Sequence, residues 1–386
     1  MSNSVHRIEK AVNICHLSTV HRRNDVRIFF KESVTLALIY GNVSLVVFDG
    51  QGNDQKAGVS IFDIGKPPKN RLFRMFAGFW KLLRNKIVNR ADIIHFHDPE
   101  LLLVGLLLRI RGKTVIYDAH EDVPRQIQNK HWIPVCLRGV IAELVELVEN
   151  FVVRHINAVV AATPLICNRF RKVNQVTIVV RNYPLLGEFV TEPLDKPQSR
   201  NVCYVGALTR ERGIIELLEA LVELGDVRLM ACGPFESKAF EAELRCHKGW
   251  GLVEYLGILD RRGVAEVMGK AQVGIVTLLP TSNQVEALPV KMFEYMASGT
   301  PVLASDFPLW SSIINSSGGG VVVNPCDPKK ISKVLAEMLQ SQEQLKGWGA
   351  AGRKAAIGCF NWERESVHLI DLYALIRTNS AQKIKK

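Results

Sequence analysis

The sequence predicts an α/β protein with two doubly wound parallel-sheet domains that face a cleft. Its 386 residues are enough for two or three domains at roughly 100–200 residues each. Short apolar segments typical of buried strands alternate with segments of helical periodicity. This alternation stops between residues 186 and 200, which are rich in proline and charge, and then begins again. Two α/β halves joined by a linker are therefore expected.

The first half is predicted to contain a series of strands and crossover helices. Apolar residues at helical spacing place helices over residues 28–39, 71–89, 101–110 and 137–153. The strands, in chain order, are AVNICHLS, VSLVVFDG, ADIIHFHDP, KTVIYDAHED, NAVVAATP and VTIVVRNYP.

The second half repeats the same rhythm after the linker. Its predicted strands are NVCYVGAL, VRLMACG, GLVEYLG, VGIVTL, PVLAS and GGGVVV. Ligands of such sheets bind outside the carboxyl ends of the parallel strands. Since no G-x-G-x-x-G follows the first strand, the usual fingerprint of NAD binding is missing.

Composition limits the class of protein. The apolar content of 47% and the aromatic content of 8% exclude a disordered chain. The longest apolar run, residues 101–108, is far shorter than the roughly 20 residues of a spanning helix. The start, MSNSVHRIEK, lacks the apolar core of a signal peptide. The eight cysteines include no C-x-x-C pair, which favours reduced core thiols. We therefore expect a cytoplasmic protein.

Positive charge is concentrated in residues 66–90, which hold eight lysines and arginines and no acid, in a chain of net charge +11. On a helix over 71–89, one apolar stripe is predicted, flanked by two more aromatics. One interpretation is a surface helix packed on its own domain. Another is contact with anionic lipid, where each cation contributes about 1 kcal/mol. We expect no nucleic-acid partner, because no recognised module is present. The stripe is Leu72, Phe76, Phe79, Leu83 and Ile87, flanked by Phe73 and Trp80.

The most informative stretch is EALPVKMFEYMASGTPVLAS, residues 286–305. Pro289 suits the first turn of a helix and Gly299 its end, so a helix is predicted over 289–298. The free N–H groups of its first turn make an anion site, to which Lys291 adds a cation. The carboxylates of Glu286 and Glu294 can accept hydrogen bonds from vicinal hydroxyls. The alternative is a well-capped helix with two solvated glutamates.

This stretch resembles the E-x7-E signature of retaining glycosyltransferases of family 4, the group 1 type. The resemblance extends over nearly the whole chain and implies the two-domain B-type glycosyltransferase fold, with Rossmann-like halves. It implies that Glu286 contacts the donor sugar and that Glu294 contacts the nucleotide ribose. The family's Gly-Phe-Gly after the first glutamate is replaced here, which leaves the identity of the sugar open. The replacing residues are Ala287, Leu288 and Pro289, and with Val290 the last two are expected beside the donor.

The break in the alternation predicts the domain boundaries, and the resemblance implies the position of the last helix. Residues 1–185 form the acceptor-side domain, 186–200 the linker and 201–360 the nucleotide-sugar domain. The last segment, residues 361–386, is expected to be a helix that crosses back to the first domain.

A second matching segment is VGALTRERGIIELLEAL, residues 205–221. The family places a glycine turn and two basic residues of this segment at the donor diphosphate. Gly206 and Arg212 match, while the first basic position is Ala207 and Arg210 is its candidate substitute. A guanidinium suits the task because its fork binds phosphate oxygens bidentately. A third segment, GLVEYLGILDRRG, resembles the stretch whose Gly257 passes the nucleotide base.

Histidines follow two predicted strands of the first half, in HFHDPE and DAHED. By resemblance His120 faces the donor sugar, where an imidazole can stabilise charge at the anomeric centre. The segment VHRRNDVRIFFKE resembles a subgroup associated with bacterial surface polysaccharides. Residues expected on the acceptor side are Asn24, Asp25, Arg27, His97 and Arg125, while Asp98, Glu121 and Asp122 are not separable from solvated acids.

The resemblance thus implies a retaining hexosyltransferase of surface polysaccharide biosynthesis, using a nucleotide-sugar donor and a glycan or lipid-linked acceptor. No D-x-D is present, so no metal is expected at the donor diphosphate and no cofactor beyond the donor. The basic helix suggests that the enzyme rests on the anionic inner face of the membrane. Two alternatives remain: an epimerase or phosphorylase on the same scaffold, and a non-catalytic protein that binds sugar nucleotides.

Overall fold

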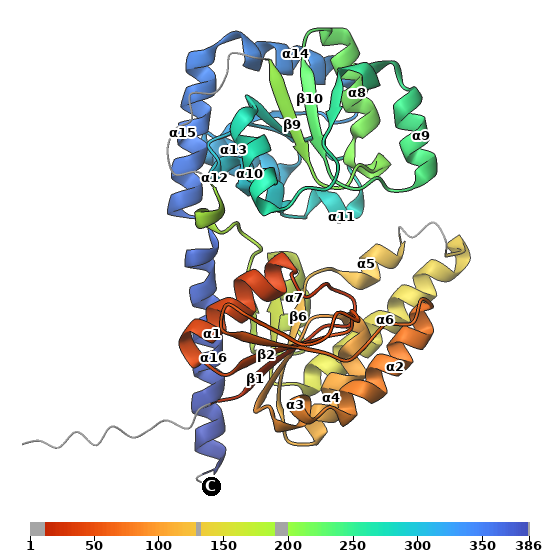
Figure 1. Cartoon of the computed structure of the whole chain (residues 1–386), viewed down its shortest axis with the longest axis vertical. Coiled ribbons are helices and arrows are strands. Elements are labelled where there is room, and N and C mark those ends of the chain that lie inside the picture. Colours follow the sequence, from red (N-terminus) through yellow and green to blue (C-terminus); the bar gives the residue numbers. More distant parts are fainter. Residues whose placement is uncertain (1–11, 129–132, 190–199, 385–386) are drawn as a thin grey trace, which may run out of the picture. The chain divides into compact units, whose positions relative to one another are not determined.

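The computed structural model describes residues 12–128, 133–189 and 200–384 (Figure 1). The segment MSNSVHRIEK and residues 190–199 of the expected linker lie outside the described residues. Contacts divide the chain into two compact units: Met1–Arg181 with Ser366–Lys386, called unit 1, and Asn182–Glu365, called unit 2. Near the start of unit 2, Leu186–Glu188 (η3) forms a short 3-10 turn.

Unit 1 is built on an eight-stranded sheet in the order β3-β4-β2-β1-β5-β6-β7-β8. Every neighbouring pair is parallel except β3 with β4. Strand order reverses between β1 and β5, the position at which doubly wound sheets bind ligands. The strands are β1 (Ile14–Leu17), β2 (Val43–Val47), β3 (Asp54–Lys56), β4 (Val59–Asp63), β5 (Ile93–Phe96), β6 (Thr114–Ala119), β7 (Ala158–Ala161) and β8 (Thr177–Val179).

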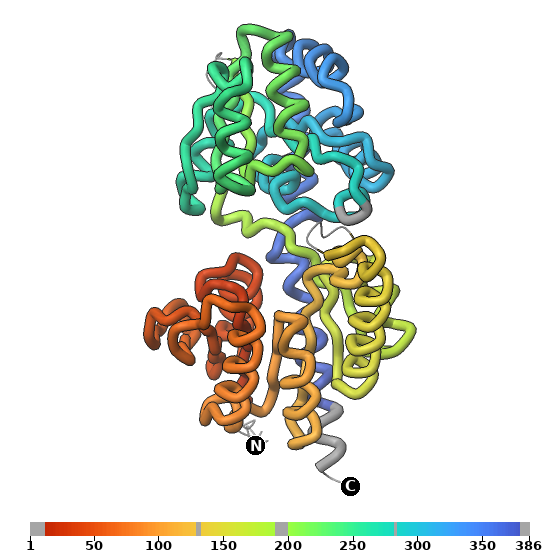
Figure 2. Tube along the Cα trace, turned by 90° about the vertical axis from the view of Figure 1, so that its right-hand side faces the viewer, coloured from red at the N-terminus to blue at the C-terminus, as the bar shows by residue number. Residues whose placement is uncertain are grey.

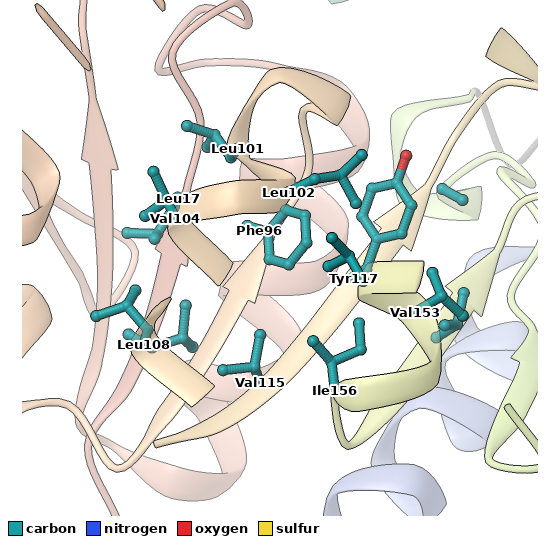
Figure 3. Packing of buried hydrophobic residues seen from close by; sticks show 14 of the residues in the cluster. Leu17, Phe96, Leu101, Leu102, Val104, Leu108, Val115, Tyr117, Val153 and Ile156 are labelled. Carbon is teal, nitrogen blue, oxygen red and sulfur yellow. The ribbon is translucent and has the colours of Figure 1, made fainter. Parts of the chain in front are cut away.

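Side-chain alternation divides the central strands between two faces. On one face Leu17, Phe96 and Tyr117 pack with α4 and α6 in a hydrophobic core (Figure 3). Because successive side chains of a strand point to opposite sides, His16, His95 and Asp118 lie on the other face. The helical segments of unit 1 are η1 (a π-helix, Val26–Ser33), α1 (Val34–Tyr40), α2 (Arg71–Arg84), α3 (Lys86–Arg90), η2 (Pro99–Leu101), α4 (Leu102–Ile110), α5 (Val123–Gln128), α6 (Val135–His155), α7 (Pro164–Arg171) and, largely in this unit, α16 (Trp362–Ile384).

The helix predicted over 71–89 is two helices, which corrects the sequence-based expectation. Asn85 ends α2, and its side chain accepts a hydrogen bond of 2.8 Å from the backbone N–H of Ile87 to cap α3. Within α2, the predicted apolar stripe is also buried only along the second half of the helix. Phe79 and Leu83 pack on the core, whereas Leu72, Phe76 and their neighbour Phe73 are exposed.

Unit 2 contains a six-stranded parallel sheet in the order β11-β10-β9-β12-β13-β14, reversing between β9 and β12. Its strands are β9 (Asn201–Val205), β10 (Arg228–Cys232), β11 (Val253–Tyr255), β12 (Val273–Val276), β13 (Val302–Ser305) and β14 (Gly320–Val323). Leu217 of α8 and Leu335 of α14 share one hydrophobic core, and the two helices run side by side (Figures 1 and 2). Met268 of α10, Phe293 of α12 and Trp310 of α13 share another. The helical segments are η4 (Arg210–Arg212), α8 (Ile214–Leu224), α9 (Lys238–Cys246), η5 (Lys248–Leu252), α10 (Arg261–Lys270), α11 (Ser282–Val285), α12 (Val290–Ala297), α13 (Pro308–Ser317), α14 (Pro328–Gln340) and α15 (Gln342–Gly358).

The two parallel sheets confirm the predicted fold class. The hairpin β3-β4 was not predicted, because its strands are short and its first strand is polar. Its turn uses Ala57 and Gly58 at φ of 50° and 78°, the positive values that a tight hairpin requires.

Two expectations drawn from composition can be compared with the described chain. All eight cysteines are free, but only Cys15, Cys167, Cys203 and Cys232 are buried, so half are not core thiols. Among the described residues, none of the helices combines the length and apolar character that a membrane crossing demands.

Candidate functional site

Three strands of unit 2 end in glycines that turn the chain at one edge of the sheet. Gly206, Gly233 and Gly257 follow β9, β10 and β11 with φ of 128°, 139° and 74°. The backbone N–H of Gly233 donates to the carbonyl of Gly257 at 2.8 Å. A Cβ on Gly233 would lie 2.1 Å from the carbonyl oxygen of Gly206, so no side chain fits there. This edge is therefore lined by closely packed backbone.

Two cations lie beside the first of these glycines. A Cβ built on Gly206 would be 2.9 Å from Nη1 of Arg212 and 3.9 Å from Nζ of Lys291. Arg212 ends η4, directly after the turn, and its Nη1 donates to the carbonyl of Ala207 at 3.4 Å. Lys291 reaches the same place from the first turn of α12. Two of the three expected phosphate-binding cations, Arg212 and Lys291, are thus brought together at Gly206.

Lys291 is nearly fully buried, and its Nζ has no hydrogen-bond partner among the described residues. Its ammonium lies 3.8 Å from the centroid of the Tyr204 ring, a cation–π contact. Burial, followed by the charge of Arg212, holds the pKa of Lys291 well below its ordinary value. An anion bound beside Gly206 would oppose both effects, because it places a negative charge next to the ammonium.

Arg210, the substitute proposed for the missing basic position, points elsewhere. Its guanidinium forms a salt bridge of 2.6 Å with Glu243 of α9 and stacks over Phe240, and its side chain is 57% exposed. The expectation that it joins Arg212 at the phosphate site is therefore not met.

The segment before α12 is fixed by a buried tryptophan. Nε1 of Trp310 donates to the carbonyl of Ala287 at 2.7 Å, and Leu288 packs against the core of unit 2. Pro289 is the N-cap residue, so the helix begins at Val290, one residue later than predicted. Glu286 is exposed in the turn between α11 and α12.

Glu294 is buried and paired, an arrangement that its position in the sequence does not indicate. Its carboxylate lies 2.7 Å from Arg261, at the start of α10, and Arg261 also pairs with Glu188. Burial opposes the charge of Arg261, but the two carboxylates outweigh it, so the pKa of Arg261 is raised. Arg261 therefore fixes the orientation of Glu294.

In unit 1 the predicted catalytic histidine lies at the carboxyl end of β6. Nε2 of His120 is 3.1 Å from Oδ2 of Asp118 and 3.2 Å from Nδ1 of His97. The His120 side chain is 17% exposed and stacks on the ring of His21 at 5.5 Å. Asp118 contacts the imidazole of His120 at Nε2, and the partly exposed remainder of the ring is accessible to a ligand.

His97 and Arg27 do not reach the surface, which corrects their prediction as acceptor contacts. His97 is 1% exposed and Arg27 is 3% exposed. The guanidinium of Arg27 donates to Asp118 at 2.8 and 3.0 Å and to the carbonyl of Val180 at 2.8 Å. These contacts occupy the arginine inside unit 1 and leave it no surface for an acceptor.

The other three predicted acceptor residues differ in what they contact. The carboxylate of Asp25 caps η1 by accepting from the N–H groups of Arg27 and Ile28, each at 2.9 Å. Arg125 forms an ion pair with Asp122, and Asn24 is exposed. Of these, Asp25 has a local structural function, because its acceptor oxygen is used by the helix.

His21 and Asp98 form a pair that the sequence did not single out. Nδ1 of His21 is 2.8 Å from Oδ1 of the fully buried Asp98. Burial disfavours charge on His21, but the hydrogen bond and charge of Asp98 prevail, so the pKa of His21 is raised. Neither this pair nor Arg261 has a local sequence signal, because each depends on contacts between separate elements.

Comparisons with known proteins place both units in related families. Residues 189–355 match the family described as glycosyl transferases group 1, and residues 40–181 match a glycosyl transferase 4-like domain. Phosphatidyl-myo-inositol mannosyltransferase of Mycobacterium leprae is 27% identical over 191 residues, 47% of this chain and 48% of that protein. The chain spans about half the length of the curated relatives it matches.

Solved structures share the fold over nearly the whole chain. Sucrose-phosphate synthase from Thermosynechococcus elongatus is 18% identical with a TM-score of 0.77, covering 95% of this chain and 100% of that one. The Anabaena protein HepE in complex with UDP is 14% identical with a TM-score of 0.70, covering 94% and 100%. At these identities the likeness establishes the fold.

Proposed function

Because the chain belongs to the group 1 glycosyltransferases, we propose that it transfers a hexose from a nucleoside-diphosphate sugar to a glycan or lipid-linked acceptor, with retention of configuration. The observation that carries this proposal is the placement of Arg212 and Lys291 beside Gly206, at the carboxyl end of β9. Two cations, one of them buried and without a hydrogen-bond partner among the described residues, suit a diphosphate.

The donor is proposed to lie along the carboxyl edge of the unit 2 sheet. Its diphosphate meets Arg212, Lys291 and the first N–H groups of α12, and its ribose meets Glu294. Gly257 passes the base, and Glu286 meets the sugar hydroxyls beside Leu288. The complex of HepE with UDP supports this proposal, because it shows a protein of the same fold with a bound nucleotide. The proposal does not specify the base of the donor.

The enzyme is proposed to accelerate the transfer by stabilising the diphosphate that departs when the bond between sugar and phosphate breaks. Negative charge then grows on the phosphate oxygens, where Arg212 and Lys291 oppose it without a metal ion. Positive charge develops at the anomeric carbon, which Glu286 of unit 2 is proposed to face. His120 of unit 1 is the second residue proposed to be catalytic. Asp118 acts as a positioning residue for His120 through their 3.1 Å contact.

Membrane attachment is proposed through the exposed face of α2, at the cytoplasmic surface. Leu72, Phe73 and Phe76 are 74%, 69% and 66% exposed, with Trp80 beside them. An exposed apolar stripe next to cations suits the boundary of an anionic bilayer. Helix α6, which contacts α4 as α2 does, also exposes large apolar side chains, namely Val140, Leu144, Leu147 and Phe151.

A lipid-linked acceptor of surface polysaccharide biosynthesis agrees with such an attachment. The mycobacterial relative bears the name of a lipid substrate, phosphatidyl-myo-inositol. Among the basic residues, Arg74 pairs with Glu100 at 3.3 Å and Lys81 donates to the carbonyl of Ile64 at 2.6 Å. The exposed Arg71, Arg84 and Lys86 are the better candidates for lipid phosphates.

The function is tested by a screen of nucleotide sugars followed by assays with lipid-linked acceptors. A donor at 100 times its dissociation constant stabilises the protein by about 2.7 kcal/mol, which a thermal shift detects. The anomeric proton coupling of the product reports retention. Glu286→Ala should bind donor and fail to transfer; transfer at the wild-type rate would contradict the role of Glu286.

The same assays separate the alternatives. An epimerase or phosphorylase would convert the donor, or consume phosphate, without an acceptor. A binding protein would show the thermal shift and no turnover with any acceptor.

A further inference from the structure

A second polar cluster lies inside unit 1. It consists of His16 on β1, His95 on β5, His97 just after β5 and Glu32 on the π-helix η1. All four side chains are at most 1% exposed. His16 and His95 are register partners on adjacent strands, so their rings point to the same side of the sheet.

The four side chains converge on one point. One ligand atom from each lies within 4.8 Å of the others. Nδ1 of His16 and Nε2 of His97 are 2.9 Å apart, and the three imidazole centroids are separated by 4.8 to 5.1 Å. Tetrahedral zinc with bonds to nitrogen of about 2.0–2.1 Å brings neighbouring ligands to about 3.3 Å, so small side-chain shifts suffice.

The cluster leaves buried polar atoms without hydrogen bonds. Within the described chain, Nε2 of His16, Nε2 of His95 and both carboxylate oxygens of Glu32 have no such partner. Arg27 is the cation in contact with Glu32, at 3.0 Å, yet the same guanidinium binds Asp118 through two nitrogens. Two buried carboxylates thus share one arginine, and Nε2 of His95 and Nδ1 of His97 each lie 4.0 Å from Oε2 of Glu32.

Outer contacts hold two of the imidazoles in the orientation that a metal requires. Nδ1 of His95 is 2.9 Å from the hydroxyl of Tyr373, and Nδ1 of His97 is 3.1 Å from Oδ2 of Asp118. A histidine that donates one ring N–H to such a partner presents the other nitrogen as a lone pair. Histidine–carboxylate pairs of this kind are typical of the surroundings of bound zinc.

The helix that supplies the carboxylate is itself unusual. Residues 26–33 form a π-helix, a rare conformation that is frequently found at functional sites. Its hydrogen bonds link residues five apart, and Arg27 and Glu32 have that spacing, so both reach the cluster. A regular helix would place these two residues on different faces.

We propose that His16, His95, His97 and Glu32 bind one divalent transition-metal ion, with zinc the best match to this ligand set. All four ligands are buried in unit 1, so the site is closed and structural. The ion supplies the positive charge and the bonds that the cluster lacks, and it ties η1 to the central strands. It is separate from the donor diphosphate, whose proposed residues belong to unit 2.

Metal analysis of the purified full chain tests the proposal. After expression with zinc and dialysis, wild-type protein and the exposed control Glu143→Gln should hold about one zinc per chain. Glu32→Gln and His16→Gln should lose at least nine-tenths of it, and cobalt-loaded wild type should show the visible absorption of tetrahedral Co²⁺. These measurements need no activity, so they stand or fall separately from the transferase proposal.

Several outcomes would overturn the site. Folded wild-type protein that holds less than about 0.1 metal per chain under these conditions, without the cobalt absorption, excludes it even if the variants do not fold. Zinc retained in both Glu32→Gln and His16→Gln places any ion elsewhere. Zinc lost only in His120→Gln would assign it to the neighbouring group His97, Asp118 and His120, which also comes within 4.8 Å, and would equally reject this ligand set.

Discussion

The ammonium of Lys291 lies 3.8 Å from the centre of the Tyr204 ring, buried in unit 2. No hydrogen bond compensates its burial within the described chain, and the nearby Arg212 repels it. A lysine in such surroundings weakens the unliganded protein and favours an anion. At the proposed diphosphate site, the buried Lys291 thus increases the affinity for an anion and reduces the stability of the unliganded protein.

Lys291→Met should therefore stabilise the free protein and weaken nucleotide binding. Removing a buried, unbonded polar group should raise the free energy of unfolding by about 1–2 kcal/mol at pH 7. Denaturant unfolding and calorimetric titration of a nucleoside diphosphate measure the two effects. Lys238→Met, at the exposed start of α9, is the matched control and should change neither.

The lowered pKa of Lys291 also predicts a dependence on pH. The unfolded lysine keeps its proton up to about pH 10.4, whereas the folded one releases it earlier. Between the two pKa values the unfolded state binds more protons, so stability should rise with pH in that window. The rise should vanish in Lys291→Met; an unchanged slope would contradict the assignment.

Arg212→Gln and Arg210→Gln should have unequal effects, although the residues are two positions apart. Charge-assisted hydrogen bonds contribute about 1.5–3 kcal/mol, so loss of Arg212 should weaken nucleotide binding roughly 10- to 100-fold. Arg210 pairs with Glu243 on the surface, and its loss should change affinity less than about twofold. Equal losses in the two variants would refute the placement beside Gly206.

Gly233→Ala should damage both the sheet edge and the donor site. Its Cβ would approach the carbonyl of Gly206 to 2.1 Å, and its φ of 139° is unfavourable for other residues. We expect a loss of about 2 kcal/mol in unfolding free energy, and weaker nucleotide binding, from backbone strain. Gly251→Ala, where nothing lies within 4 Å, is the control. Comparable melting temperatures for the two variants would show that the backbone at this edge of the sheet shifts to accommodate the added methyl group, and would contradict the prediction.

Arg261→Met should destabilise unit 2 by about 1–2 kcal/mol, since it leaves the buried Glu294 without its cation. The estimate is modest because the arginine side chain is 30% exposed. The adjacent Arg262→Met, whose side chain is 89% exposed, should be neutral. Nucleotide affinity should fall in Arg261→Met but not in Arg262→Met. When Arg261→Met is combined with Glu294→Gln, the loss of affinity should be smaller than the sum of the two separate losses. Fully additive effects would indicate that the two residues act separately.

Replacing Phe73 and Phe76 by serine should reduce binding to anionic vesicles at least tenfold, because burying each ring in lipid contributes about 1.5–3 kcal/mol. Co-sedimentation with phosphatidylglycerol and phosphatidylcholine vesicles measures the effect. Ile357→Ser, which removes an exposed apolar side chain of α15 in unit 2, is the control. Binding that ignores the anionic lipid, or that persists in the double variant, would exclude α2 as the attachment.

The sequence predicted the parts of this fold that depend on local pattern. Apolar strands, the glycine that follows β9 and the proline at the start of α12 each have a local physical cause, and so they were found. Asn85 was missed as a break because its cap competes with a continuous helical pattern in residues 71–89. The π-helix η1 has no local signal that separates it from an ordinary helix.

The candidate site was less predictable for the same reason. Arg212 and Lys291 were identified by motif, and the fold brings them together. Arg27 was assigned to the acceptor side from the resemblance of its segment, and His97 from its place at the end of a predicted strand. Their burial goes with contacts that a local pattern does not reveal: Asp118 of β6 pairs with both residues, and Glu32 of the same π-helix pairs with Arg27. The pairing of Glu294 with Arg261 likewise required the tertiary structure.

The central claim is that unit 2 binds a nucleotide through its diphosphate, at Gly206, Arg212 and Lys291. The most direct test is calorimetric titration with the preferred nucleoside diphosphate, its monophosphate and the nucleoside, in wild type and Arg212→Gln. Affinity should fall more than 100-fold from diphosphate to nucleoside in wild type, and the variant should lose most of that difference. A nucleoside that binds as tightly as the diphosphate, or a difference that survives in Arg212→Gln, would contradict the account.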